Sequence, residues 1–494
     1  MENVRDHGAH GDGTDATDAV QAAIDTCGDE GGGRVHVPPG EYETAPLELH
    51  SGVNLHLAGG ATVRASGDAD DYETDDVPHR SFITAVDAED VAVTGRGTID
   101  CNGRAFMRDA VIDPRDGHYQ PVPREESPDG PLFPDDDRPD RALFFYRCSN
   151  VQLRNVTVRD APHWTVHLLA CDEVDARGVD VLNDRMVPNN DGINPDMSRN
   201  VHISDCTVRA GDDAICVKAD GRYPEARPCE NVTVTNCTLQ SRSCGIKLGS
   251  ESEYDIRNCL FANCTITDSN RGVGIQNRDA GDIERIAFTD LVVETRHHTG
   301  NWWGIGEPVS ITSLPRTAET DLGTLRDVRL SNLTVEGEGS VVVYADPDDP
   351  VCDLRIEGVT QRVTTGDHSA DRNAIDLRPG EVDGGVRERD LPAVFLHGVD
   401  RATLQDVTVE WADSLPYHTH ALECEGFGDL VVDGFRGRQA DDGAAVALSD
   451  GGRAVVRRCL ADDGTDVFLA TDDVEHVTAT DSVTDAARTG RTTE

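Results

Sequence analysis

Short segments of alternating apolar and polar residues recur along most of this 494-residue chain. Each unit has the form apolar-x-apolar-x-(Asn/Asp)-apolar-x-apolar, so that Asn, Asp or Gly divides two strand-like halves. This alternation predicts β-strands with one buried face. The clearest copies are NVQLRNVTV, EVDARGVDV, NVHISDCTV, NVTVTNCTL, NCLFANCTI, RIAFTDLVV and DVRLSNLTV.

The copies are spaced like the turns of a coil. Equivalent positions lie 23, 27, 31, 27 and 27 residues apart, at Val151, Val174, Val201, Val232, Cys259 and Ile286. Looser copies follow at Val328, Leu354, Ala402, Leu430, Ala454 and Val477. Leucine-rich repeats need an LxxLxL frame that this chain lacks, and propeller blades need about 40 residues. The spacing therefore predicts an all-β fold, a right-handed parallel β-helix whose coils stack about 4.8 Å apart.

We expect residues 1–494 to form a single β-helix domain. An Asp/Thr start and apolar residues at helical spacing in residues 12–26 predict a short N-terminal capping helix, within a cap and first coils over 1–60. Residues 102–141 are rich in Pro, Asp and Gly and predict an insertion or lid. The main coils then occupy 142–316, and C-terminal coils occupy 317–494.

The charge changes the picture of the surface. With 92 acidic and 45 basic residues the formal net charge is −47, and only Lys218 and Lys247 are lysines. An Asp-rich, Lys-poor surface is typical of extreme halophiles, so we interpret the charge as salt adaptation. No basic patch is present to bind nucleic acid. No signal peptide or membrane span is recognisable, which predicts no membrane partner and a cytoplasmic location, while the oligomeric state stays open.

The 14 cysteines recur mostly in one phrase, as in SDC, TNC, RNC, ANC and RRC. No CxxC pair or Cys/His zinc spacing occurs, so we expect no metal site and no cofactor. In a reducing compartment these residues are expected to be small buried apolar side chains.

The candidate catalytic residues lie in two short motifs, NNDG and GDD, which contain Asp191, Asp212 and Asp213. Asp191 and Asp212 are 21 residues apart, so on successive coils they fall near equivalent positions. Crowded carboxylates raise the pKa of at least one member, and a protonated acid beside an ionised one is what glycoside hydrolysis needs. Coil-corner turns and a calcium site are alternative explanations of the same residues.

These phrases resemble glycoside hydrolase family 28, the polygalacturonase family. NxDG is matched by Asn189, Asp191 and Gly192, and GDD by Gly211 to Asp213. The similarity runs from about residue 8 to residue 316 and includes APHWTVHLLACDEV and NWWGIGEPVSITSLPR. It implies inverting hydrolysis of pectin-derived oligosaccharides. Asp212 would be the general acid, and Asp191 and Asp213 would hold and deprotonate the water.

Two departures from the family concern the residues around the acids. The family's GHG motif falls on Ser243-Cys244-Gly245, so its His is absent, and its basic RIK motif falls near Gly274-Ile275-Gln276. The resemblance and the local sequence give a set of expected substrate-binding residues: Asn189, His163, Lys247, Arg271, Arg278, Trp303 and Glu307. Lys247 and the two arginines would replace the missing charges, and Trp303 with its neighbour Trp302 would be a stacking platform for sugar.

The absence of an export signal favours trimming of imported fragments, hence exo action on a pectic oligosaccharide. Loss of the RIK charges leaves a neutral-sugar or rhamnogalacturonan-type glycosidase open. A lyase or uronate epimerase of the same fold is a second alternative, which would need a basic residue and often calcium. A non-catalytic carbohydrate-binding solenoid is the third.

Overall fold

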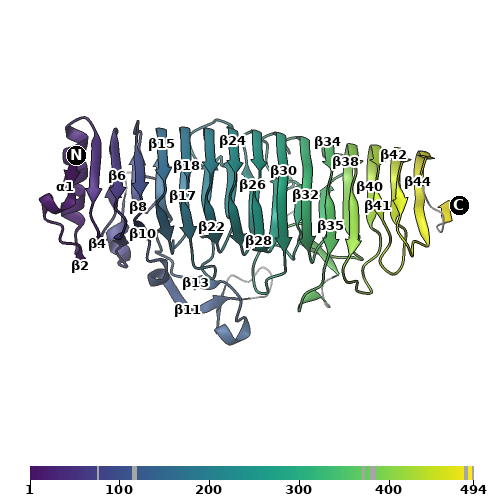
Figure 1. Ribbon diagram of the computed structural model, residues 1–494, viewed down its shortest axis with the longest axis horizontal. Coiled ribbons are helices and arrows are strands. Elements are labelled where there is room, and N and C mark those ends of the chain that lie inside the picture. Colours follow the sequence, from purple (N-terminus) through teal and green to yellow (C-terminus); the bar gives the residue numbers. More distant parts are fainter. Residues whose placement is uncertain (75–76, 114–119, 370–372, 379–384, 483–487, 492–494) are drawn as a thin grey trace. The chain divides into compact units, whose positions relative to one another are not determined.

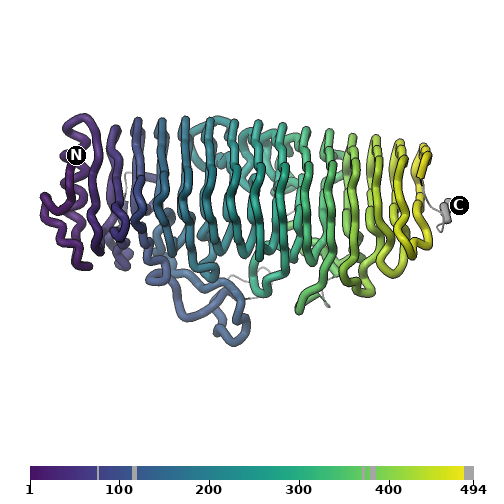
Figure 2. Tube along the Cα trace, viewed as in Figure 1, coloured from purple at the N-terminus to yellow at the C-terminus, as the bar shows by residue number. Residues whose placement is uncertain are grey.

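The computed structural model describes residues 1–74, 77–113, 120–369, 373–378, 385–482 and 488–491. The chain forms two compact units. The first comprises residues 1–218, 222–242 and 299–302, and the second comprises 219–221, 243–298 and 303–494. In both, short parallel strands stack coil upon coil (Figures 1 and 2). The fold is the right-handed parallel β-helix that the repeat predicted, while a single domain over 1–494 stays a prediction.

Two successive coils of the first unit illustrate the architecture. One coil holds β17 (Trp164–Leu169), β18 (Asp172–Arg177) and β19 (Asp180–Leu182), and the next holds β20 (Ile193–Asp196), β21 (Arg199–Ser204) and β22 (Thr207–Ala210). Each strand pairs in parallel with its counterpart, as in Val166 with Ile193, Val174 with Val201 and Val181 with Val208. All three pairs are 27 residues apart, which confirms the predicted repeat.

Rows of identical small residues fill the interior. Val151, Val174, Val201 and Val232 are at most 1% exposed, because alternate side chains of a strand point to one face. All 14 cysteines are free thiols, and all except the half-buried Cys352 are buried. The Sγ atoms of Cys148 and Cys171 donate to main-chain carbonyls of their own or a neighbouring coil. The prediction of a buried, non-disulfide role is confirmed.

The coil corners use asparagine and aspartate in the left-handed conformation. These side chains tolerate a positive φ better than other non-glycine residues do. Members of the set are Asn150, Asn155, Asn200, Asp205, Asn231, Asn236, Asn258 and Asn263, with φ between 51° and 60°. Neighbouring corners bond to one another, since the amide of Asn231 donates to Asn200 Oδ1 at 2.9 Å and that of Asn200 donates to Glu173. The recurrent Asn/Asp position of the repeat, as at Asn155, Asp205, Asn236 and Asn263, is one of these corners.

The N-terminal helix α1 (Thr17–Asp29) confirms the expected cap, but it begins five residues later than expected, because Asp12–Asp15 form strand β2. Its apolar side, which includes Val20 and Ile24, is fully buried. The helix contacts β3 (Gly33–Val37), β5 (Leu47–Glu48) and β6 (Val53–Leu57), which belong to the first coils. It therefore covers apolar residues at the beginning of the first stack. Among the described residues, no helix combines the length and apolar character that a membrane crossing requires.

The expected insertion is a separate antiparallel sheet on the first unit. Its strands are β11 (Met107–Ile112), β12 (Pro121–Val122) and β13 (Leu132–Pro134), whereas residues 114–119 lie outside the described residues. Val111 and Leu132 pack against Val187, and the Leu132 N–H donates to the Met186 carbonyl at 2.7 Å. The insertion thereby rests on the segment that leads into NNDG.

The second unit repeats the same pairing. Strand β26 (Cys244–Ser252) pairs with β29 (Arg271–Asn277), β29 with β31 (Val309–Ser313), and β31 with β33 (Val341–Ala345). A small antiparallel pair, β36 (Ala374–Asp376) with β37 (Val386–Glu388), interrupts the stack. Charged residues of this hairpin contact side chains of β29.

Candidate active site

Asp191 and Asp213 are direct neighbours on successive coils of the first unit. Ile193 of β20 pairs with Ile215 of β23 (Ile215–Ala219). The register continues before both strands, because the Gly192 N–H donates to the Asp213 carbonyl at 2.9 Å. Both acidic residues are 2% exposed. Two buried carboxylates are therefore aligned side by side.

Asp212 lies one residue out of this register and is more exposed than its neighbours. The coil that joins the acids is 22 residues long, so Asp213 occupies the position in line with Asp191, and Asp212 is adjacent to it. Asn189 donates to Asp212 Oδ2 at 3.4 Å, and Arg138 of the insertion donates to Asn189 Oδ1 at 2.8 Å. Ser241 Oγ donates to the Asp212 carbonyl at 2.5 Å. The insertion thus helps to orient the residue that touches Asp212.

Tight packing explains the glycines of both phrases. A Cβ on Gly192 would lie 2.3 Å from the Ala214 carbonyl oxygen, and one on Gly211 would lie 2.3 Å from that of Val187. The Gly211 N–H donates to Asn190 Oδ1, while the Asn190 carbonyl accepts from Asn183. Only glycine allows the main chain of the two acidic segments to come this close.

One potential metal-ligating group is found among the described residues. Oxygen atoms of Asp191 and Asp213 and the Cys216 Sγ all lie within 4.8 Å of one another. Asn194 also donates to Asp191 Oδ2, at 3.2 Å. A thiol with two carboxylates is a mixed donor set, unlike the all-oxygen coordination that calcium prefers. The arrangement is therefore explained by a pair of acids that binds water at least as well as it is explained by a calcium site.

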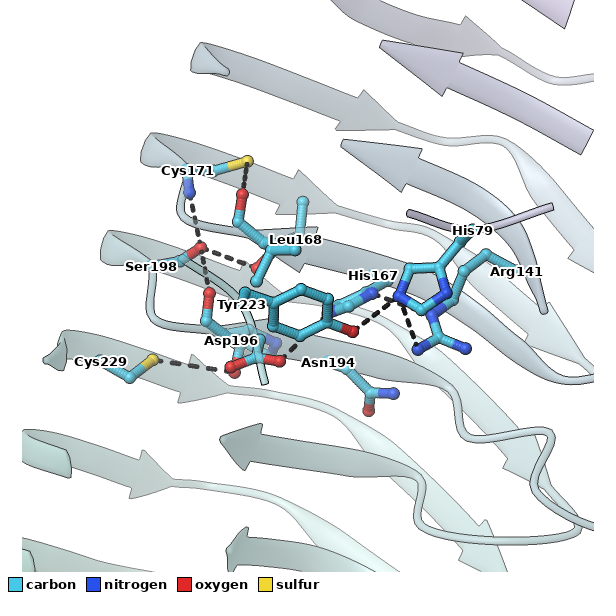
Figure 3. A network of polar contacts seen from close by, with 12 residues as sticks. His79, Arg141, His167, Leu168, Cys171, Asn194, Asp196, Ser198, Tyr223 and Cys229 are labelled. Atoms are coloured by element: carbon cyan, nitrogen blue, oxygen red, sulfur yellow. Dashed lines mark hydrogen bonds and ion pairs between the residues drawn. The ribbon is translucent and has the colours of Figure 1, made fainter. Parts of the chain in front are cut away.

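A cationic and aromatic cluster is formed by residues of β14 (Arg141–Tyr146), β17, β20 and β23 (Ile215–Ala219). Figure 3 draws its members Arg141, His167 and Asp196. The guanidinium of Arg141 is 3.9 Å from the Trp164 ring centre, and the Lys218 ammonium is 4.6 Å from it. Arg141 Nε donates to His167 Nδ1 at 2.9 Å, and His167 Nε2 lies 3.2 Å from Asp196. Burial and the charge of Arg141 hold the pKa of His167 well below its usual value, so this imidazole is neutral.

His79 and Tyr223 belong to loops that are far apart in the chain, and their side chains meet next to this cluster (Figure 3). His79 Nε2 lies 2.6 Å from the Tyr223 hydroxyl and 3.2 Å from Arg141 Nη2. The His79 ring also packs on Phe144, and both His79 and Tyr223 contact the ring of His167. Burial, with the charges of Arg141 and Arg222, lowers the pKa of His79 to about 3.

His163, an expected substrate-binding residue, lies at the edge of this cluster. It is half-buried, and its Nδ1 accepts from the Trp164 N–H at 2.8 Å. Its pKa is well below the ordinary value because of burial and the charges of Arg138 and Arg141. Sequence reasoning did not single out Arg138, Arg141, His79 or Tyr223, since no motif connects them.

The other expected recognition residues belong to the second unit. Lys247, 6% exposed, pairs in register with Gly274 of the RIK position. Arg271 and Glu307 are 3% and 1% exposed and form an ion pair at 3.4 Å. Arg271 Nη2 also meets the carboxylate of Asp376 at 2.9 Å. The structure places Arg271 and Glu307 in a buried anchor, and their contact with substrate stays a prediction.

The two adjacent tryptophans differ in their surroundings. In the second unit, the half-buried Trp303 has the Arg378 guanidinium 4.7 Å from its ring centre, and Arg378 also donates to Gln276 Oε1 at 2.9 Å. Arg278 is 7% exposed in the same unit. In the first unit, Trp302 Nε1 donates to the Asp129 carbonyl at 2.8 Å. Arg378 is a residue that the sequence did not reveal.

Comparison with known proteins identifies the family of this chain. The profile of glycosyl hydrolases family 28 matches residues 27–300. A probable polygalacturonase of Vitis vinifera is 28% identical over 452 residues, which are 86% of this chain and 86% of that protein.

Two solved structures share the fold. The family 28 exopolygalacturonase of Yersinia enterocolitica has a TM-score of 0.64 and 21% identity, over 88% of this chain and 78% of that one. The hyperthermoactive exopolygalacturonase of Thermotoga maritima has a TM-score of 0.61 and 23% identity, over 83% and 91%. Because the family profile spans more than half of the chain, and the acids of NNDG and GDD meet on neighbouring coils, this protein belongs to glycosyl hydrolases family 28 and is an O-glycosyl hydrolase.

Proposed function

We propose that this protein is an exo-acting, inverting hydrolase of galacturonate oligosaccharides derived from pectin. The observation that carries the proposal is the alignment of Asp191 with Asp213, next to the more exposed Asp212. Hydrolysis with inversion requires an acid for the leaving oxygen and a separate base for water. The three carboxylates offer both functions.

Asp212 is the proposed general acid, because it is the member of the trio that is open to an approaching glycosidic oxygen. Asp191 and Asp213 are proposed to hold the attacking water between them and to take its proton. The closeness of their oxygens supports this role, since one water molecule bonds to two acceptors at such a separation. Asn189 is proposed to fix the Asp212 carboxylate, to which it donates.

Exo action is supported by the contact of His79 with Tyr223. The two side chains meet at 2.6 Å over Phe144 and His167, on the side of the earlier coils. Strands β14 and β20 are two coils apart, so about 10 Å separates this contact from the level of Asp191. A substrate that lies along the stack would meet an obstacle within a short distance of the acids.

The surface beyond His79 gives further support. A cavity of about 600 Å³ lies there, and four acidic residues are among those that line it: Asp25, Glu48, Asp71 and Glu73. A polyanionic galacturonate chain is repelled by such a lining. Both solved relatives described above are exopolygalacturonases, which agrees with this proposal.

The test is a time course of product release from galacturonate oligomers labelled at the reducing end, in molar KCl. We expect one short product to appear from the earliest times, with the intermediate lengths shortening stepwise. Internal fragments that appear first would overturn exo action. Asp212→Asn is the matched inactive control. Proton NMR of the first anomer released tests inversion, and a first product with retained configuration would overturn that part.

The same assay addresses a lyase, the alternative that the nearby Lys218 favours. In its neutral amine form, this side chain can accept the proton that elimination removes from C5 of a uronate. A lyase leaves an unsaturated uronate, which absorbs in the ultraviolet, whereas a hydrolase does not. We expect reducing ends to appear without an absorbance rise and without sensitivity to a chelator. An absorbance rise that matches the new ends would replace hydrolysis with elimination.

A further inference from the structure

The basic residues of the RIK position are absent from β29, and the packing around Gly274 leaves little space for a side chain there. A Cβ on Gly274 would lie 3.3 Å from both the Cys244 Sγ and the Ser310 carbonyl oxygen. A side chain at this position would require these neighbours to shift by a few tenths of an ångström. A positive charge at this part of the second unit therefore comes from residues outside the RIK position, and other segments of the chain contribute to it.

One segment is the preceding strand. Lys247 of β26 lies in register beside Gly274, and its neighbours Ile246 and Leu248 are fully buried. Since side chains alternate between the two faces of a strand, Lys247 points away from the interior row. Its side chain lines a small cavity of about 10 Å³, the space of one water molecule, together with Gln276, Trp303 and others.

The second segment is the hairpin β36–β37, more than 100 positions along the chain. Arg378, directly after β36, donates from Nη1 to Gln276 Oε1 at 2.9 Å and lies over the Trp303 ring. Its backbone has a φ of 65°, an uncommon conformation for arginine. The Arg378 N–H is held by Asp376 Oδ1 at 2.8 Å. Strain that the surroundings hold in place is frequent at binding sites.

A buried anchor fixes the hairpin to the coil. Arg271 of β29 pairs with Asp376 at 2.9 Å and also donates to its carbonyl at 2.6 Å. Glu307 accepts from the Asp376 N–H at 3.2 Å, and the Gly304 N–H donates to the Asp376 carboxylate at 2.9 Å. Arg271 is thus a positioning residue for Arg378, and its own charge is compensated by two carboxylates.

Positive charges repel one another here, although the chain as a whole carries a net charge of −47. Burial, then the charges of Arg378 and Arg316, lower the pKa of Arg278 to about 10, and they outweigh the opposite effect of Asp279 and Glu251. Arg316 is compensated by Asp279, which it meets through two bonds of 2.7 Å. Among the described side chains, Arg378 contacts the neutral Gln276 and Trp303. An anion that entered between Lys247, Arg278 and Arg378 would relieve this repulsion.

We propose that Arg378, with Lys247 and Arg278, forms a carboxylate-binding subsite for a uronate of the substrate. Arg378 replaces a charge of the missing RIK motif from a different part of the chain. Arginine suits the role because its planar group binds both oxygens of a carboxylate and stacks on an aromatic ring. The inference rests on the proposed action on galacturonate and names what selects the acid form over a neutral sugar.

The test compares trigalacturonate with its methyl ester for the wild type, Arg378→Gln, Arg378→Lys and Arg401→Gln. Arg401 is a matched control, because it is half-exposed and pairs with Asp353 and Asp400 on the surface. For Arg378→Gln we expect kcat/KM on the free acid to fall about 10- to 100-fold, mainly through KM, since a hydrogen-bonded charge is lost. The methyl ester should lose less than about threefold, Arg378→Lys should be intermediate, and Arg401→Gln should resemble the wild type.

An unchanged kcat/KM for Arg378→Gln would overturn the subsite, as would an equal loss on both substrates with a lowered melting temperature. If the wild type cleaves neither substrate, the proposed function fails, and calorimetric titration with digalacturonate then tests the subsite by itself. Binding that weakens about 10-fold in Arg378→Gln and is retained in Arg401→Gln supports it. Equal binding by both variants rejects it.

Discussion

The carboxylates of Asp191 and Asp213 occupy the same register position on consecutive coils, and each has an oxygen within 4.8 Å of the other and of the Cys216 sulfur. Two ionised groups this close repel each other, and water or a proton between them relieves the repulsion. The coil geometry therefore imposes on these two side chains an arrangement that neither strand has alone.

Replacing one carboxylate at a time should show that each of the three acids is needed for catalysis. For Asp212→Asn, Asp191→Asn and Asp213→Asn we expect kcat to fall about 100- to 10,000-fold, because each removes proton transfer at nearly constant shape. Asp348→Asn, at an exposed loop position, is the control and should retain activity. Initial rates on trigalacturonate measure the loss. Near-wild-type activity in Asp212→Asn would remove it as the general acid.

Opening the contact of His79 with Tyr223 should change the product. In Tyr223→Ala we expect longer products and some internal cleavage, since the obstacle at 2.6 Å from His79 is gone. Tyr223→Phe keeps the ring and should retain the short product, although the hydrogen bond is lost. Mass spectrometry measures the length of the oligosaccharides that are released first. Identical products from the wild type and Tyr223→Ala would show that this contact does not limit the substrate.

Acid should destabilise the fold through His79. Its pKa is about 3 when folded and near 6.5 in an unfolded chain, so below pH 6.5 the unfolded state binds the extra proton. The contribution to stability is complete above pH 6.5 and is lost progressively as the pH falls towards 3. Melting temperatures between pH 7 and 4.5 should therefore decline, and less steeply in His79→Gln. Parallel curves for both proteins would contradict the assignment.

Breaking the anchor of the hairpin should be costly. Arg271→Met leaves Glu307 and Asp376 buried without their shared cation, and we expect a loss of about 3–5 kcal/mol of unfolding free energy. Arg401→Met removes an exposed pair and should cost less than about 1 kcal/mol. Urea titration of the purified proteins gives both values. A similar, small cost in both variants would show that the buried pair is dispensable.

Salt should stabilise the protein. With a net charge of −47, self-repulsion opposes the compact state, and the screening length shortens from about 10 Å at 0.1 M to about 3 Å at 1 M salt. We expect the melting temperature to rise from 0.1 to 2 M in KCl and in NaCl alike. Sucrose at equal osmolality, which does not screen, is the control. A melting temperature that is flat or falls with salt would oppose salt adaptation.

The β-helix could be predicted from the sequence, because the residues that determine each coil lie within the repeat itself. The Val rows, the left-handed Asn corners and the capping helix follow from residues close together in the chain. The three acids were found because a one-coil spacing is itself a sequence pattern. The predicted register was wrong by one residue, because Asp191 is aligned with Asp213 and not with Asp212. The length of a coil depends on its loops, so only the pairing of Ile193 with Ile215 determines the register.

Contacts made by irregular segments were not predictable in this way. His79 and Tyr223 are 144 positions apart, and Arg378 and Gln276 are 102 apart, with no repeat to relate them. Arg378 also follows the part of the chain where family resemblance was recognisable. Both contacts depend on how a loop folds back onto the stack, which is decided by packing and not by local periodicity.

The asparagine corners have a consequence for how such a protein adapts. Asn and Asp both accept the left-handed conformation, and both kinds occur at equivalent corners of successive coils, as at Asp205 and Asn236. An amide can thus be exchanged for a carboxylate there without a new backbone path. A lineage that moves into brine can accumulate negative charge corner by corner, while the interior rows that hold the acids in register remain untouched.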